Sequence, residues 1–262
     1  MTSLLFKLAG PMQAWGSGSR WASRATDLAP TKSGVIGLLA AASGLERSAP
    51  LGKLMTLRFG VRIDQPGSVA VDFQTARTLD GKTSMPLSHR AFLQDAVFLA
   101  GVESEDRGYL AELKSALQRP YFPLFLGRRA FPPAGPLKTE LVDASLEQAF
   151  AAHDWQASER HQRSQEAAAV NLPFLIDVPA GTPGAQTQRD VPISFDQRRR
   201  EYGWRDIGAG SVTLSNPWGK PNEGGSPPSG LDPNAPDPEV PTPERPAQGE
   251  GHDPMAPLME EA

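Results

Sequence analysis

Apolar positions recur with a strand-like period in several short segments of the N-terminal half. The segments that predict strands are 4–8, 54–64 and 69–78, and a turn at Pro66-Gly67 predicts that the last two pair as a hairpin. Residues 33–43 are apolar on nearly all sides and are followed by Gly44, which predicts a buried helix with a glycine stop. The N-terminal half therefore mixes strands with at least one core helix.

The next stretch of the chain begins with the polar, turn-rich segment LDGKTSMPLSH at 79–89, which predicts an exposed excursion. Residues 90–102 again have a strand pattern. Residues 107–118 place leucines three and four positions apart, which predicts an amphipathic helix. A short strand is expected at 121–126.

The order strand, helix, hairpin, strand, helix, strand predicts an α+β fold with a ferredoxin-like, RRM-like antiparallel sheet. The helices are expected on one face of the sheet, and 79–102 is expected to form an insertion. The pattern beyond residue 138 is weaker. It favours a helix at 146–152, a loop or surface helix at 156–169, and strands at 172–178 and 191–195.

Charge and proline are distributed unevenly along the chain. The whole sequence has 26 basic and 30 acidic residues, but 216–262 holds two basic and nine acidic residues, together with twelve of the 26 prolines. Such a segment buries too little apolar surface to offset its ordering entropy, so 216–262 is predicted to be a disordered acidic tail. The remaining domain, 1–215, has 24 basic and 21 acidic residues and is mildly basic, which is compatible with an RNA-binding role.

Composition excludes several classes of protein. Cysteine is absent, and His89, His153, His161 and His252 lack metal-ligand spacing, so neither a metal nor a cofactor is expected. No charged segment precedes a long apolar run at the N-terminus, and the longest apolar stretch, 35–42, is too short to span a bilayer. We therefore expect a cytoplasmic protein without membrane contact.

A basic loop and a helix start lie next to each other near the N-terminus. The side chains that they offer to a ligand are Gln13, Trp15, Arg20, Arg24, Lys32 and Ser33. Helix-start donors, arginines and an aromatic ring are suited to hold a nucleic-acid backbone and its bases. The alternatives are a packing role for Trp15 and an N-cap with a surface lysine at 31–33. A nucleotide-binding loop is disfavoured because Thr26 and Thr31 replace both glycines of GxxxxGK[ST].

Further basic residues are candidates for RNA contact. Gly127 lets the backbone approach a ligand closely, and Arg128 and Arg129 offer bidentate phosphate contacts or stacking. The other candidates are Arg77, Arg90, Arg198, Arg199 and Arg200. The alternative for both arginine runs is a solvated turn or face.

No catalytic motif is present. Metal-independent RNA cleavage needs a general base, a general acid and a cation near the phosphorane. His89, Lys82, Tyr109 and Tyr121 have suitable chemistry, but no motif sets them together. We therefore predict no catalytic residue and a protein that is not an enzyme.

Four blocks carry a family resemblance that covers about residues 3–214. They are GPMQAWG with PTKSGVIGLLAAASG, LSHRAFLQDAVFLAG, RPYFPLFLGRRAFPPAGPL and RDVPISFDQRRREYGWRDI. In this order and spacing they resemble the CasD family, RAMP-superfamily subunits of the type I-E CRISPR Cascade complex.

The resemblance implies a non-catalytic structural subunit that binds the 5′ handle of crRNA and caps the backbone filament. It further implies that 79–102 is a thumb-like β insertion in a RAMP-type fold. Contacts with a CasC-type backbone subunit and a CasA-type large subunit are implied as well, and contact with target DNA only through the assembled complex. Because the handle is single-stranded, splayed and stacked bases are the expected mode of binding. The alternative is a metal-independent endoribonuclease that processes pre-crRNA, an activity found in relatives from another CRISPR subtype.

Overall fold

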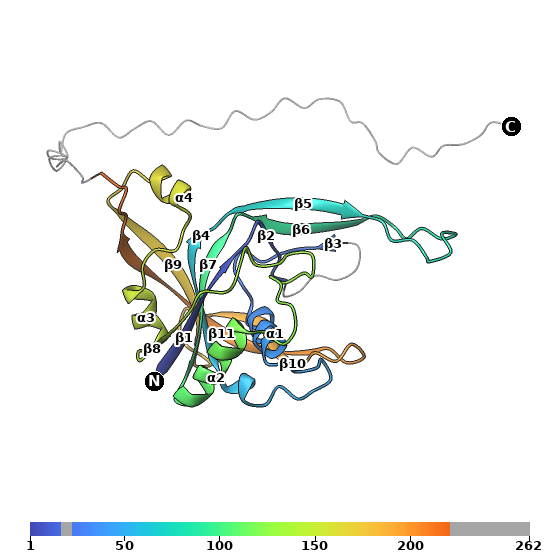
Figure 1. The fold of residues 1–262 in the computed structure, drawn as a ribbon, viewed down its shortest axis with the longest axis horizontal. Coiled ribbons are helices and arrows are strands. Elements are labelled where there is room, and N and C mark those ends of the chain that lie inside the picture. Colours follow the sequence, from blue (N-terminus) through green and yellow to red (C-terminus); the bar gives the residue numbers. More distant parts are fainter. Residues whose placement is uncertain (17–22, 221–262) are drawn as a thin grey trace, which may run out of the picture. The chain divides into compact units, whose positions relative to one another are not determined.

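The computed structural model describes residues 1–16 and 23–220. Within them, a seven-stranded antiparallel sheet has the spatial order β10-β11-β9-β4-β7-β1-β8 (Figure 1). Its strands are β1 (Thr2–Ala9), β4 (Arg58–Gln65), β7 (Val97–Ser104), β8 (Thr139–Val142), β9 (Ala169–Val178), β10 (Gln186–Ser194) and β11 (Glu201–Ser215). The predicted mixture of helices with an antiparallel sheet is confirmed.

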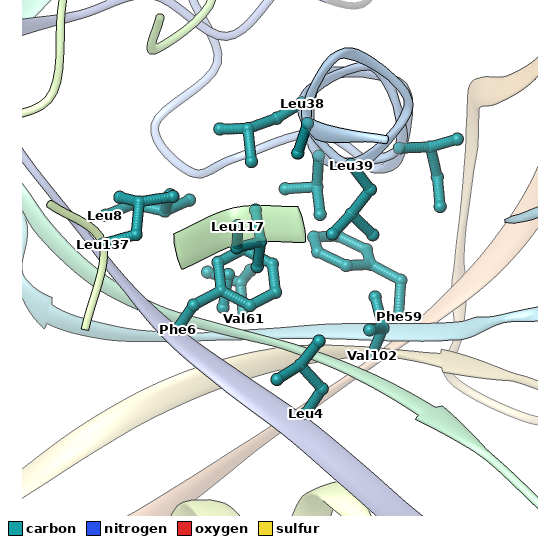
Figure 2. Packing of buried hydrophobic residues seen from close by; sticks show 14 of the residues in the cluster. Leu4, Phe6, Leu8, Leu38, Leu39, Phe59, Val61, Val102, Leu117 and Leu137 are labelled. Carbon is teal, nitrogen blue, oxygen red and sulfur yellow. The ribbon is translucent and has the colours of Figure 1, made fainter. Parts of the chain in front are cut away.

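Two helices, α1 (Lys32–Ala42) and α2 (Arg107–Gln118), pack on one face of this sheet. The hydroxyl of Thr31 accepts a hydrogen bond from the backbone of Gly34 at the start of α1, and Gly44 adopts a positive φ of 76° just beyond its end. Figure 2 shows Leu4, Phe6 and Leu8 of β1 lying with Leu38 and Leu39 of α1 in the core of this layer. Burial of each such side chain contributes about 1.5–3 kcal/mol relative to exposure.

A third helix, α3 (Leu146–Ala152), covers the opposite face. Leu5, whose side chain alternates with those of Leu4 and Phe6, packs with Leu146 and Phe150 of α3. The prediction that the helices lie on one face was therefore wrong. The continuous apolar run of β1 is the sequence signal for a strand that is buried on both faces.

Arg62, which is paired with Asp64 within β4, joins this strand to the end of α3. Arg62 makes a bidentate contact with Asp64. Its Nε and Nη2 atoms each lie 2.8 Å from one carboxylate oxygen of Asp64. Arg62 also donates to the carbonyl oxygens of Phe150, His153 and Asp154. The guanidinium thus satisfies carbonyl groups that the end of a helix leaves without partners.

A smaller sheet contains a long hairpin. It is formed by β2 (Met12–Gln13), β3 (Ser23–Arg24), β5 (Ser68–Gln74) and β6 (Ser88–Gln94), with β5 on one edge of β6 and β2 and β3 along the other. The β5–β6 hairpin projects beyond the main sheet (Figure 1), and its tip, 75–87, is exposed as predicted for 79–89.

The hairpin corrects two predicted pairings. Segments 54–64 and 69–78 do not pair with each other, because β4 pairs with β7 and β9 while β5 pairs with β6. Residues 90–102 are not one strand either, since the chain turns at Asp95, which has a positive φ of 53°, and enters β7. Because β7 lies inside the main sheet, the projection spans β5 to β6 rather than 79–102.

The remaining segments show smaller differences. Residues 54–57 were predicted as strand but overlap the 3-10 helix η1 (Gly52–Thr56). Residues 121–126 are not a strand, because the backbone N–H groups of Tyr121 and Phe122 bond to the carbonyls of Ala42 and Ala41 at the end of α1. The predicted surface helix is α4 (Glu159–Ser164), and the 15-residue strand β11 was missed.

The folded region extends past the predicted boundary at 215. The buried amide of Asn216 donates to the carbonyls of Gln162 and Gln165, and Arg163 lies 3.8 Å from the ring centre of Trp218. Residues 221–262, which hold most of the predicted disordered tail, lie outside the described residues. No helix in the part of the chain that is described is long and apolar enough to cross a membrane.

Candidate nucleic-acid interface

Three arginines, Arg24, Arg90 and Arg128, lie close together beside the half of the β5–β6 hairpin that is nearer its tip, and we call them the arginine cluster. Arg24 on β3 is the register partner of Arg90 on β6, and Asp72 on β5 is the partner of Arg90 on its other side. Strand pairing therefore aligns two arginines and one carboxylate across three strands. These positions are far apart in sequence, so only the fold brings them together.

A tight turn adds Arg128 to the cluster. Gly127 has a φ of 88°, and a Cβ at this position would lie 1.6 Å from the carbonyl oxygen of Ala14, so the turn requires glycine. Arg128 donates through Nη2 to the carbonyl oxygen of Ala91 at 2.8 Å, and its guanidinium lies 5.5 Å from the ring centre of Phe131. Gly127 thus lets the turn lie against the backbone of Ala14 rather than against a ligand, and this packing fixes the position of Arg128.

The positive charge of the arginine cluster is not neutralised by the fold. Burial lowers the pKa of Arg128, the charges of Arg90 and Arg24 lower it further, and only Asp72 opposes them. The Nε atom of Arg90 is buried without a hydrogen-bond partner among the described residues, a condition that costs about 1–3 kcal/mol. Among residues 1–16 and 23–220, no carboxylate forms an ion pair with any of these arginines.

This arrangement is suited to an anion. Guanidinium groups bind phosphate through two parallel N–H donors, and no carboxylate of the described chain pairs with those of the arginine cluster. Arg129, next to the cluster, is exposed. The rings of Phe92 and Phe131, 5.6 Å apart, form an apolar cluster beside it that limits competing water. A phosphodiester at this place would reduce the repulsion among the three positive charges.

Gln13 and Trp15 lie in the core rather than at this surface. Trp15 is 1% exposed and packs against Gly34 of α1, where a Cβ would lie 2.8 Å from its ring. Its indole N–H donates to Oε1 of Gln13, and the Gln13 amide donates to the carbonyls of Ala96 and Leu8. The packing alternative for Trp15 fits this burial, which leaves no ring surface for a stacked base.

Lys32 and Ser33 are also buried. Lys32 belongs to what we call the buried network, Lys32, Asp177, Asp190 and Arg205. Its Nζ lies 2.6 Å from Asp177, and its backbone N–H donates to Asp190 at 2.7 Å. The carboxylate of Asp190 therefore occupies the α1 N-terminus, where we expected an RNA phosphate. Ser33 has its hydroxyl 3.4 Å from that of Thr31, inside the helix start.

Arg205 completes the buried network from β11. It contacts Asp177 at 2.6 Å and Asp190 at 2.6 Å. Burial alone would lower the pKa of Arg205, but the hydrogen bond to Asp190 and the charges of Asp190 and Asp177 outweigh burial and raise it. In this network two cations face two carboxylates, so the charges balance within the fold.

The other candidates lie apart from the arginine cluster. Arg77 is in the exposed hairpin tip, and Arg198, Arg199 and Arg200 are exposed in the turn between β10 and β11. Arg20 lies outside the described residues. Arg189 and Trp204 were not among the candidates from the sequence. Arg189 lies on β10 before that turn, and Trp204 lies on β11 after it. Recognition of β11 as a strand would have placed Trp204 on the face opposite Arg205.

The side chains considered for catalysis come from separate elements. His89 is on β6, Lys82 is in the hairpin tip, Tyr109 is on α2, and Tyr121 packs on Gly44 beyond α1. Burial raises the pKa of Tyr109, and the charges of Glu112 and Asp106 add to this effect. In the described ranges, no group of three or more His, Asp or Glu residues is placed to hold a metal ion.

The chain thus has a mixed α/β fold in which three arginines without an ion-pair partner among the described residues gather beside a projecting hairpin. Residues 3–208 match the family described as CRISPR-associated protein (Cas_Cas5), and the chain belongs to this family. The resemblance that the four sequence blocks carry is thereby confirmed.

Individual relatives agree with this assignment. The chain is 33% identical over 161 residues to CRISPR system Cascade subunit CasD of Escherichia coli (strain K12), covering 54% of this chain and 72% of the relative. A solved structure described as a CRISPR RNA-guided surveillance complex contains a chain with 31% identity and a TM-score of 0.66, covering 84% of this chain and 95% of that one. A crystal structure of a Cas protein gives 34% identity and a TM-score of 0.64, with coverage of 82% and 95%.

Proposed function

We propose that this protein is the CasD-type subunit of a type I-E Cascade complex, where it binds the 5′ handle of crRNA without cleaving it. The observation that carries the proposal is the arginine cluster, whose mutual repulsion is opposed by Asp72 alone and which has no ion pair among the described residues. The relatives are named as a Cascade subunit and as part of an RNA-guided complex, which supplies the class of anion. In such complexes the protein holds the RNA, and base pairing reads the target.

The proposal includes a ferredoxin-like, RRM-like unit as the scaffold. In chain order this unit is β1-α1-β4-β7-α2-β8, and its strands lie side by side as β4-β7-β1-β8. Two β-α-β halves interleaved in this way support the assignment. The arginine cluster lies beside this unit: Arg24 and Arg90 are on the smaller sheet, whose β5–β6 hairpin is inserted between β4 and β7, and Arg128 is on the turn after Gly127.

The proposed partners follow from the hairpin. Alternate positions of β5 place Val69, Val71 and Phe73 on one face, and all three are exposed. Exposed apolar side chains on a projection favour a protein contact, and we assign it to a CasC-type backbone subunit that this protein caps. A CasA-type large subunit and, through the complex, target DNA complete the assembly, which we place in the cytoplasm. Deleting 80–86 at the hairpin tip should leave a folded monomer that assembles poorly.

The test of the RNA site is binding of synthetic crRNA carrying the 5′ handle of the host's own repeat. Arg90→Gln and Arg128→Gln should each weaken binding and reduce the salt slope by about 0.7, the value for one phosphate of a single strand. Arg107→Gln is the matched control, because Arg107 is exposed on α2 and already paired with Asp143. Binding by both cluster variants that equals the parent's at every salt concentration would show that the site is misplaced.

The absence of cleavage is tested separately. The pure protein is incubated with full-length repeat RNA in EDTA, and we expect no cut at a defined position. A defined cut that survives removal of divalent metal would assign the protein to the endoribonucleases.

A further inference from the structure

The outward face of the β10–β11 hairpin carries an exposed tryptophan. Trp204 is 66% exposed, although large apolar side chains usually lie inside. The pairing of β10 with β11 is irregular between Gln188 and Val191, so two residues of β10 stand opposite Trp204. This bulge turns Asp190 inward to the buried network and leaves Arg189 outside, beside Trp204.

The surroundings of Trp204 are cationic. The guanidinium of Arg189 lies 5.9 Å from its ring centre and is held by a hydrogen bond from Nε to the carbonyl of Tyr202. Asp206, on the same side of β11, already accepts hydrogen bonds from Gly181 and Thr187. The adjacent turn has three exposed arginines, of which Arg199 alone is paired, with Glu201 at 3.5 Å, among the ion pairs of the described chain.

We propose that this surface, Arg189, Trp204 and the arginines at 198–200, binds a second stretch of single-stranded RNA with a base stacked on Trp204. The inference rests on the proposed function and extends it, because this surface belongs to the main sheet while Arg24 and Arg90 of the arginine cluster belong to the smaller one. An exposed aromatic ring beside a cationic turn is the combination that binds single strands without reading sequence: bases stack on the ring, and arginines follow the phosphates. The excess of arginine over carboxylate in the turn favours RNA over an acidic or apolar protein partner.

The experiment measures binding of the same synthetic crRNA to Trp204→Ala, Trp204→Phe and Trp218→Ala. Loss of a stacking ring should weaken binding about tenfold for Trp204→Ala, whereas phenylalanine should retain most of the affinity. Trp218→Ala is the matched control, since Trp218 is also exposed and also faces an arginine, Arg163, but lies beside α4. Ultraviolet cross-linking followed by mass spectrometry should attach RNA to Trp204 and not to Trp218.

Three results would overturn the inference, and each is distinct. If Trp204→Ala binds RNA and assembles like the parent while Arg90→Gln binds RNA weakly, the second RNA contact is wrong and the proposed function stands. If neither variant loses affinity, the proposed function fails as well. If Trp204→Ala keeps RNA affinity but loses assembly with the other subunits, the surface is a protein interface. Circular dichroism of each variant verifies folding.

Discussion

The buried network and the arginine cluster contain similar residues with opposite consequences. In the network, Lys32 and Arg205 face Asp177 and Asp190, and every contact between a cation and a carboxylate is 2.9 Å or less. In the cluster, three arginines share one nearby carboxylate, Asp72, with which none of them forms an ion pair in the described chain. Charge that the fold balances is structural, whereas charge that it leaves unbalanced is available to a ligand.

The two regions also differ in what they connect. The network joins the start of α1 to β4, β9, β10 and β11, since Asp177 also accepts a hydrogen bond from the backbone N–H of Phe59. The arginine cluster joins the projecting hairpin to a glycine turn, and no carboxylate of the described chain forms an ion pair with it. A mutation in the network should therefore change stability, and one in the cluster should change binding.

The largest expected effect is that of Asp190→Asn. This change leaves Arg205 and the α1 N-terminus without their buried carboxylate, and breaking a buried ion pair costs about 3–5 kcal/mol. Urea denaturation should show this loss as a lower midpoint with an unchanged slope. Lys53→Ala is the control, because the Lys53–Asp106 pair is exposed and such pairs contribute little. Equal midpoints for Asp190→Asn and Lys53→Ala would show that the buried network contributes no more to stability than an exposed ion pair does.

The second largest expected effect is the stabilisation of the folded protein by bound crRNA. A ligand present at 100 times its dissociation constant stabilises the folded state by about 2.7 kcal/mol. The parent should gain this increment from crRNA, and so should Arg205→Lys, which keeps the network's charge. The double variant Arg90→Gln, Arg128→Gln should gain much less at the same RNA concentration, although it should be as stable as the parent without RNA. Thermal melting with and without crRNA measures both values, and an undiminished gain in the double variant would contradict the assignment.

The local features that the sequence predicted correctly are those that depend on neighbouring residues. The apolar helix with Gly44 behind it, the leucine spacing of α2 and the exposed polar tip of the hairpin all appear in the structure. The pairing of the strands was predicted less well. Gly67 permits a turn after β4 whichever strand β5 then pairs with, and no feature of the local sequence indicates that β5 pairs with β6 rather than with β4. β11 was missed because it contains polar and glycine positions, and its pairing with β9 and β10 stabilises it.

The candidate site shows the same limit. Lys32 and Arg128 were both candidates for RNA contact, since both are basic and lie beside a turn or a helix start. They differ because Lys32 is bonded to Asp177 and Asp190, which lie more than 140 positions after it and belong to β9 and β10. Whether a charge is balanced is a property of tertiary packing, so a single sequence identifies candidate cations but does not separate structural ones from those that bind ligands.

The smallest effect tests an intermediate case, the half-exposed pair of Arg58 and Glu147. Arg58 donates to both carboxylate oxygens of Glu147 at the start of α3, and this hydrogen bond lowers the pKa of Glu147 below its usual 4.5, against the effect of burial. A carboxyl group whose pKa is lower in the folded state contributes stability that is fully present above the unfolded pKa and is lost as the pH falls through the folded pKa. Because solvent screens the pair, we expect Glu147→Gln to cost only about 0.5 kcal/mol at neutral pH.

That cost should be constant from pH 7 down to about the unfolded value of 4.5 and should disappear at lower pH, where the parent's Glu147 is protonated as well. Denaturation of parent and variant across the acidic range measures it, and Glu105→Gln, an exposed glutamate without an ion pair in the described chain, is the control. A cost at pH 7 as large as that of Asp190→Asn would show that half-exposed pairs behave like the buried network. A cost independent of pH would show that the hydrogen bonds of Glu147, rather than its charge, stabilise the start of α3.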